Sequence, residues 1–292
     1  MFYYFCLGNY FCLYKASVDL FFGFWDFVCS FYFGLLFFVC LESAFVKTFC
    51  KENFLVAVAG LTGVTLYQFT ENLALDFTTA SNVSIIVAIC PIFTALTSQI
   101  FLKEKHLSVK FCIGFLLAFA GIILVCFNGK INFNLNPKGD ILALTSAICW
   151  GFYSLFLTMI NKKGHNTILI TRKIFFYAIL FMIPLMICGV FAENPKSTAY
   201  VELSSILNAE RFSSILNWIL LCFLGIIASG FCFVAWNKAC NILGTVKIST
   251  GLYLIPVITI FFAAIFLKEK LTIMGAIGSV LTIIGLFVSS KK

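Results

Sequence analysis

The hexapeptide IFLKEK occurs twice in this chain, at Ile100–Lys105 and again at Ile265–Lys270. Each copy closes a long apolar segment, and the copies start 165 residues apart in a chain of 292 residues. A repeat at this distance indicates that the second half of the chain duplicates the first. Charged side chains directly after an apolar run are typical of a helix end at the membrane–water interface.

The composition predicts that the chain is an integral membrane protein. Hydrophobic residues make up 62% of the chain and charged residues 11%, with a mean hydropathy of +1.05. Soluble domains are about half apolar and about one quarter charged. About 20 apolar residues are enough to cross ~30 Å of hydrocarbon as a helix. The expected spans are residues 1–14, 18–41, 54–77, 80–102, 107–127, 139–160, 167–191, 216–237, 244–267 and 272–289.

The fold expected from these runs is all-α, with ten transmembrane helices. Long apolar runs without alternation exclude membrane strands, and hydrocarbon leaves only helices or closed barrels. With the N-terminus inside, thirteen Lys and Arg residues fall on inside segments and seven outside. This bias predicts a multi-pass protein of the cell membrane with both termini in the cytoplasm. The net charge of +8 is scattered among loops, so nucleic acid is not an expected partner.

Neither a cofactor nor a metal ion is expected. The thirteen cysteines lie mostly inside spans and show no C-x-x-C spacing, which favours small buried hydrophobic residues over ligands. His106 and His165 both fall in loops, and we assign them no role.

The halves can be aligned residue by residue. At an offset of 165 the alignment pairs Pro91 with Pro256, Asn72 with Asn237 and Ser84 with Ser249, and one residue of slippage pairs Gly114 with Gly278 and Gly121 with Gly285. Near the start, FCLGNY at Phe5–Tyr10 matches ICWGFY at Ile148–Tyr153 at an offset of only 143. The second half therefore contains 22 additional residues, and the polar segment 192–215 is the predicted insertion, an outer loop.

The expected repeats are residues 1–138 and 139–292, with five spans each. Because five is odd, the second repeat must enter the membrane upside down relative to the first. Inverted repeats of this kind are typical of secondary transporters, which expose a midplane site alternately to each side.

Two segments resemble a known family. Residues 71–125 contain ALDFTTAS, an A-L-x-x-T-x-A-S pattern followed by the mid-span Pro91, and are similar to the first EamA repeat of the drug/metabolite transporter superfamily. Residues 235–288 are similar to the second. The resemblance implies export or exchange of small metabolites such as amino acids through a central cavity. Its partners would be a small-molecule solute and the lipid bilayer, with protons as a candidate coupling ion, and both a monomer and a homodimer are compatible with it.

Polar residues inside spans predict the solute pathway, because buried polar groups in a membrane tend to face the bundle interior. The predicted pathway residues are Asn9, Gln68, Glu71, Asn72, Ser81, Ser84, Trp150, Tyr153, Trp236, Asn237, Ser249 and Tyr253. For the serines, close helix packing is the alternative, and for the tryptophans a place at the membrane interface. Pro91 and Pro256 are predicted to bend their helices, either as hinges or as fixed kinks.

Glu71 is the predicted functional acid. It lies about six residues, or ~9 Å, from the centre of its span and within the hydrocarbon. Burial favours its neutral form, which suits coupling of solute and proton movement. The alternative is a structural hydrogen bond to a neighbouring helix.

Two other classes of function compete with transport. A membrane-embedded enzyme would need reactive groups, but the chain has no H-E-x-x-H pair, no clustered aspartates and no histidine within a span. A non-transporting sensor or scaffold is the third class, and it predicts a closed or apolar interior.

Overall fold

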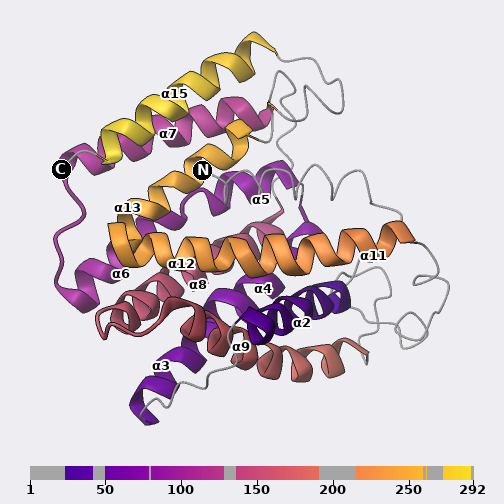
Figure 1. The fold of residues 1–292 in the computed structure, drawn as a ribbon. Coiled ribbons are helices and arrows are strands. Elements are labelled where there is room, and N and C mark those ends of the chain that lie inside the picture. The colour runs from indigo at the N-terminus through magenta and orange to yellow at the C-terminus, as the bar shows by residue number, and fades with distance from the viewer. Residues whose placement is uncertain are drawn as a thin grey trace.

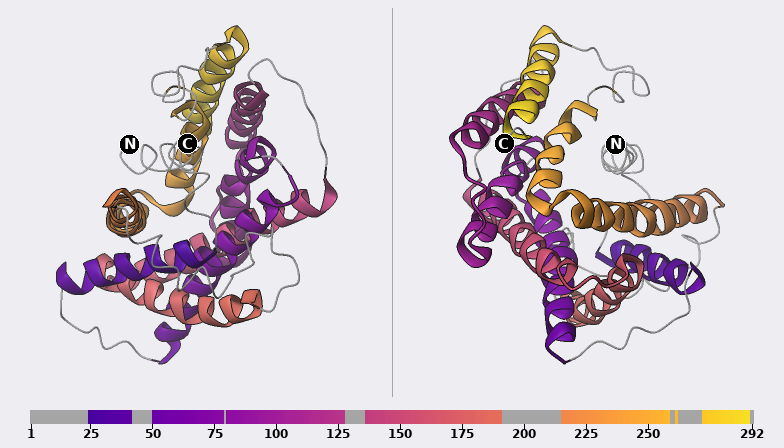
Figure 2. Two further views of the ribbon diagram at one scale, coloured as in Figure 1. Left: turned by 90° about the vertical axis from the view of Figure 1, so that its right-hand side faces the viewer. Right: turned by 60° about the vertical axis from the view of Figure 1, so that its left-hand side comes forward.

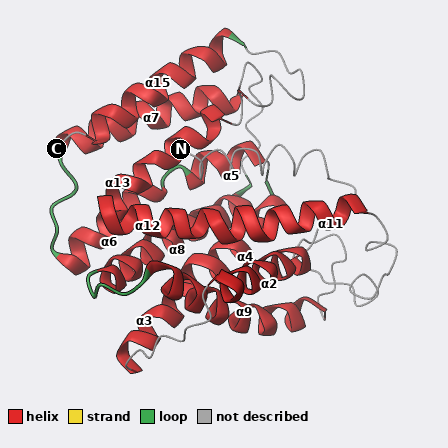
Figure 3. Cartoon of the chain, viewed as in Figure 1, coloured by secondary structure: helices red, strands yellow, loops and turns green. Residues whose placement is uncertain are grey.

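The computed structural model describes residues 24–41, 50–78, 80–127, 136–190, 215–258, 261 and 272–290. In these ranges every regular element is a helix, as expected (Figure 1 and Figure 3). The elements are α2 (Phe24–Leu41), α3 (Cys50–Gly60), η1 (Leu61–Leu66), α4 (Tyr67–Leu75), α5 (Ala80–Val87), α6 (Cys90–Leu102), α7 (Val109–Phe127), α8 (Pro137–Asn161), α9 (Thr167–Val190), α11 (Ile215–Cys222), η3 (Phe223–Phe231), α12 (Cys232–Leu243), α13 (Thr245–Thr250), η4 (Gly251–Tyr253) and α15 (Ile273–Ser290).

Seven helical stretches among the described residues are long and apolar enough to cross a membrane. They are Glu52–Leu75, Asn82–Leu102, Val109–Cys126, Pro137–Asn161, Thr167–Leu185, Gly225–Leu243 and Ile273–Ser290. Each matches one of the ten expected spans. Of the other three, residues 1–14 lie outside the described residues, α2 lies within 18–41, and a shorter apolar helix, Thr245–Ile258, lies within 244–267.

Helix ends follow local chemistry that the apolar pattern alone does not fix. The span expected at 216–237 runs on to Leu243, because its end is set by Gly244 at a φ of 87°, a backbone angle that glycine adopts without strain. The expected end, at the charged Lys238, was therefore wrong by about one and a half turns. The start of α8 was placed closely, since Asn136 accepts a hydrogen bond from the Lys138 N–H and Pro137 occupies the first turn.

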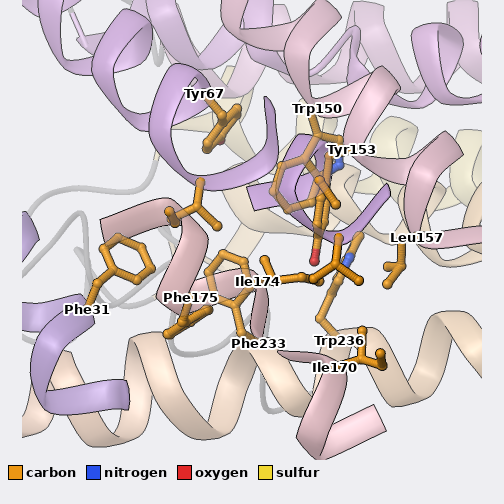
Figure 4. Packing of buried hydrophobic residues seen from close by; sticks show 14 of the residues in the cluster. Phe31, Tyr67, Trp150, Tyr153, Leu157, Ile170, Ile174, Phe175, Phe233 and Trp236 are labelled. Carbon is orange, nitrogen blue, oxygen red and sulfur yellow. The ribbon is translucent and has the colours of Figure 1, made fainter. Parts of the chain in front are cut away.

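Helix α8 is the centre of the described bundle. It packs against α3, α4, α5 and α6, whereas α9 packs against α2, α3 and η1. The largest core cluster is built around α8 and α9 and contains Trp150, Tyr153, Leu157, Ile174 and Phe175 (Figure 4). Outward-facing side chains such as Leu144 and Phe176 are apolar and exposed, as hydrocarbon around the bundle requires.

Helices α7 and α15 form the closest helix pair, side by side in Figure 1 and in the right-hand view of Figure 2. Glycines allow the approach. A Cβ atom built on Gly121 or on Gly278 would lie 2.6 Å from the carbonyl oxygen of the other, and one on Gly285 would lie 2.6 Å from the Gly114 carbonyl oxygen. The contacts run in opposite chain directions, so the pair is antiparallel. Small residues at such crossings let backbones approach in membranes.

A second pair of contacts also joins helices of the first half to helices of the second half. A Cβ on Gly34 of α2 would lie 3.1 Å from the Gly225 carbonyl oxygen of η3. A Cβ on Gly60 of α3 would lie 3.3 Å from the Tyr177 Cβ atom of α9. By the offsets of 165 and 143, Gly60 corresponds to Gly225 and Gly34 to Tyr177. The same contact is therefore made twice, with the halves exchanged.

Helix irregularities recur at matching positions. A π-helical turn ends at Leu66 before α4, and another ends at Phe231 before α12, 165 residues later. The starts of α7 at Val109 and α15 at Ile273 are 164 residues apart, which is the slippage seen in the glycine pairs. The two halves thus repeat local backbone detail as well as sequence.

Each of the two prolines follows an irregular turn of its helix. Pro91 occupies the first turn of α6, after a break at Ala88–Ile89, and Pro256 follows the 3-10 turn η4. A proline in the first turn lacks only an N–H that would have no helical partner, so the break relieves the clash expected for a proline inside a helix. Both breaks lie within one turn or so before the proline. The hinge role of Pro91 and Pro256 stays a prediction.

Candidate functional site

Four aromatic rings from three helices meet in the core (Figure 4). The Trp150 ring of α8 lies 5.0 Å from Tyr67 of α4, 5.3 Å from Tyr153 and 5.4 Å from Trp236 of α12, between ring centroids. Trp150 and Trp236 are 3% and 2% exposed. The structure therefore places both tryptophans inside the bundle, against the alternative of a membrane-interface position.

A buried hydrogen-bond relay begins beneath these rings. The Tyr153 hydroxyl donates to Asn237 Oδ1 at 2.6 Å, and Asn237 Nδ2 donates to Thr171 Oγ1 of α9 at 2.9 Å. Thr171 in turn donates to the Thr167 carbonyl oxygen at 2.7 Å. The relay joins α8, α12 and α9, and Asn237 is fully buried. Sequence reasoning found Tyr153 and Asn237 but missed Thr171, whose position on α9 carried no visible signal.

Glu71 lies on α4 next to the aromatic group. The Tyr67 hydroxyl donates to Glu71 Oε1 at 3.3 Å, one turn away on the same helix. Asn72 Nδ2 donates to the Gln68 carbonyl oxygen at 2.7 Å in the same i to i−4 pattern. These four residues thus share one helix face, as the periodicity predicts, and within the described residues the Glu71 carboxylate has no hydrogen-bond partner on another helix.

Buried hydroxyls form a second polar group. Ser249 of α13 donates to Thr94 of α6 at 3.4 Å, and Thr94 donates to Ser154 of α8 at 3.3 Å. The hydroxyl oxygens of Thr158 of α8 and Thr245 of α13 are joined by a hydrogen bond of 2.5 Å. The sequence pointed to Ser249 alone, because its partners lie on helices that only the folded chain brings together.

The remaining predicted residues do not join these groups. Tyr253 packs against Phe115 of α7, with ring centroids 6.3 Å apart, in a separate cluster. Ser84 is half-buried on α5. The side chain of Ser81 and the whole of Asn9 lie outside the described residues.

Several buried side-chain polar atoms have no hydrogen-bond partner among the described residues. Among them are the Trp150 indole Nε1 and the Tyr253 hydroxyl oxygen, which belong to predicted pathway residues. A buried donor without a partner is costly, so such an atom is a candidate contact for a solute.

The first IFLKEK motif anchors one end of the bundle. Lys103 ends α6 in a left-handed conformation, and Glu104 pairs with Lys162 of the α8–α9 turn at 2.8 Å and with His106 at 2.9 Å. Lys162, followed by His106, holds the pKa of the Glu104 carboxyl below its ordinary value. The second motif lies outside the described residues.

Replacing Glu104 by glutamine tests this anchor through pH. Because the pKa of Glu104 is lowered in the folded state, its contribution to stability is present above the ordinary pKa of 4.5 and is lost as pH falls through the lowered value. We expect a small loss of thermal stability in Glu104→Gln at neutral pH, because the pair is partly exposed. The difference from the unaltered protein should vanish in acid. An equal deficit at all pH values, or a deficit in the exposed Lys105→Gln control, would contradict the assignment.

Comparison with known proteins identifies the class to which this bundle belongs. The model of the EamA-like transporter family matches residues 3–127 and again residues 137–291. The chain belongs to the EamA-like transporter family. The two matches divide the chain near the predicted boundary between the halves, and together they cover nearly its whole length.

Relatives of this EamA-like protein are named as transporters. An uncharacterized transporter of Archaeoglobus fulgidus is 30% identical over 81% of this chain and 76% of its own length. A Streptantibioticus cattleyicolor protein named "Probable terminal-alkyne amino-acid exporter" is 23% identical over 82% of this chain and 73% of its own. A solved crystal structure shares the fold with a TM-score of 0.77 at 18% identity, over 99% of this chain and 94% of the other. Family and relatives indicate a transporter rather than an enzyme.

Proposed function

We propose that this EamA-like protein is a secondary transporter that exports or exchanges small metabolites such as amino acids by alternating access. The reciprocal contacts between the halves carry the proposal. Gly121 meets Gly278 while Gly114 meets Gly285, and these are repeat mates with their roles exchanged. Exchange of this kind is what a twofold axis produces. The contacts Gly34–Gly225 and Gly60–Tyr177 are a second pair in which repeat mates exchange roles. They support the same twofold axis independently.

A twofold axis between antiparallel helices that cross the membrane lies in the membrane plane. This supports two inverted repeats, residues 1–138 and 139–292, with ten helices in all. Inverted halves around one site provide two states of similar energy that face opposite sides. That symmetry gives a scaffold or an enzyme no evident advantage.

The charged end of the bundle supports the orientation. Glu104, Lys162, Lys163 and Glu52 all lie at the end that the excess of Lys and Arg assigns to the cytoplasm, where Lys163 pairs with Glu52 at 2.9 Å. Under this topology both termini are cytoplasmic and the segment 192–215 is an outer loop of a protein in the cell membrane.

The solute site in this proposal lies between Glu71, the aromatic group around Trp150 and the start of α6. Glu71 supplies a charge-bearing acceptor, and Trp150 Nε1 supplies a buried donor without a partner. Aromatic faces beside a carboxylate suit a solute that carries an amine and some apolar surface. Protons are the coupling ion that Glu71 can carry.

Release from cells tests the function. Cells that overproduce the protein should release one or more amino acids or nucleosides faster than cells carrying the empty vector, and the released compounds should be chemically unchanged. Release of an altered compound would favour an enzyme. A screen in which no compound differs from the vector control, with the protein present in the membrane, would contradict the proposal.

A further inference from the structure

The ends of several helices gather on one side of the molecule. The α8–α9 turn (residues 162–166), the α12–α13 junction at Gly244 and the α6–α7 loop (residues 103–108) lie together on the left of Figure 1. We call this side the turn end. On this side Glu104 pairs with Lys162, and Glu52 pairs with Lys163.

Hydrogen bonds join α12 and α13 to α6, α8 and α9 close to the turn end. Four of these bonds are Tyr153–Asn237 at 2.6 Å, Thr158–Thr245 at 2.5 Å, Ser249–Thr94 at 3.4 Å and Asn241–Thr167 at 3.5 Å. Each residue lies no more than eight positions, or ~12 Å at 1.5 Å per residue, from the turn-end terminus of its helix. We call these four bonds the turn-end lock.

Away from the turn end the same helices pack against different neighbours. The first half of α8, which begins at Pro137, packs with α4 and α5 around Ala143, Ala74 and Val83. The helix that leads into α12, formed by α11 and η3, packs instead against α2. The lock therefore lies where two groups of helices converge, and not along their whole length.

The sequence repeats part of the lock. Asn237 and Ser249 correspond to Asn72 and Ser84 at an offset of 165, and Tyr153 corresponds to Tyr10 at an offset of 143. In inverted repeats, mates lie at equal depths from opposite membrane surfaces. In the described structure Asn237 accepts from Tyr153 of α8 and donates to Thr171 of α9.

We infer that the turn-end lock closes the solute pathway toward the turn end and must open once in every transport cycle. The inference rests on the proposed function. Exposing the region of Glu71 and Trp150 to the turn end requires α12 and α13 to part from α6, α8 and α9, and this breaks the four bonds. Neutral hydrogen bonds suit the task, because each contributes little net free energy and can be broken reversibly.

Hydrogen–deuterium exchange in lipid nanodiscs tests the lock without any solute. Thr158→Val and Tyr153→Phe each remove one bond of the lock and keep the side-chain volume nearly unchanged. We expect each to raise amide exchange in residues 162–167 and 241–246 by roughly two- to tenfold, the effect of one net hydrogen bond. Thr145→Val is the matched control, since Thr145 lies on α8 with the same bond to the residue four earlier but faces outward. Exchange in both lock variants equal to that in Thr145→Val overturns the inference.

A reversible cross-link tests the requirement for opening. Thr167→Cys combined with Asn241→Cys, oxidised in proteoliposomes, should stop transport of a mixture of radiolabelled amino acids, and reductant should restore it. Each single variant should transport equally with and without oxidant. Full-rate transport by quantitatively cross-linked protein overturns the lock. If the unaltered protein moves none of the mixture, the proposed function has failed for these solutes, and the exchange comparison still decides the lock.

Discussion

Gly121→Leu should prevent assembly of the folded protein. A Cβ atom at this position would lie 2.5 Å from the Thr282 backbone nitrogen and 2.6 Å from the Gly278 carbonyl oxygen, both of them backbone atoms of α15. Neither can move away without separating α7 from α15, the most closely packed helix pair of the molecule. Overpacking of this kind costs about 3 kcal/mol, or roughly a hundredfold in the folding equilibrium. The measurement is the yield of monodisperse protein in mild detergent and its thermal stability.

Ala120→Val is the control for this substitution. Ala120 neighbours Gly121 on α7 but faces outward, so added methyl groups should meet lipid and leave stability unchanged. Because the halves exchange contacts, Gly285→Leu should be as damaging as Gly121→Leu, since its Cβ would lie 2.6 Å from the Gly114 carbonyl oxygen. Normal yield and stability of Gly121→Leu would contradict the described α7–α15 packing.

Glu71→Gln should abolish the response of transport to a pH gradient. Glutamine keeps the oxygen that accepts from the Tyr67 hydroxyl, so the local fold should persist, but it cannot take up or release a proton. We expect accumulation driven by a proton gradient to be lost while exchange of solute for solute continues. The measurement is uptake into proteoliposomes with and without an imposed pH difference.

Asp76→Asn provides the comparison for Glu71. Asp76 is an acid just past the end of α4, one turn beyond Glu71, and it should not affect coupling. A Glu71→Gln protein that folds and keeps the pH response of the unaltered protein would show that Glu71 is not the coupling acid. Loss of the response in Asp76→Asn alone would move the role to that residue.

Periodicity in the sequence predicted which residues share a helix face but not what that face meets. Tyr67, Gln68, Glu71 and Asn72 share one face of α4, which depends only on the helical repeat. Asn237 was expected to line the pathway as a polar residue inside a span. In the fold it is fully buried between Tyr153 and Thr171, an arrangement set by the packing of α12 on α8 and α9.

Threonines were the main omission from the predicted site. Thr94, Thr158 and Thr171 are ordinary residues for a membrane helix, since each can satisfy its hydroxyl on its own helix. Only the crossing of helices gives them partners elsewhere, at Ser249, Thr245 and Asn237. No single-helix pattern carries that information.

For the glycine pairs as well, the sequence predicted only part of the arrangement. Alignment of the halves matched Gly114 with Gly278 and Gly121 with Gly285 as repeat mates. The exchange of partners that indicates a twofold axis needs the antiparallel approach of α7 and α15, which depends on tertiary contacts. For the prolines, the sequence predicted bends in the two helices. In the structure an irregular turn precedes each proline.

Counterflow in proteoliposomes tests the central claim most directly. Purified protein is reconstituted into vesicles loaded with unlabelled amino acids, and uptake of the same labelled amino acids is measured at trace concentration. A transporter that alternates between two faces predicts saturable uptake that is accelerated by solute on the far side and is absent from protein-free vesicles. Uptake no faster than in protein-free vesicles, for every compound that overproducing cells release, would contradict the account.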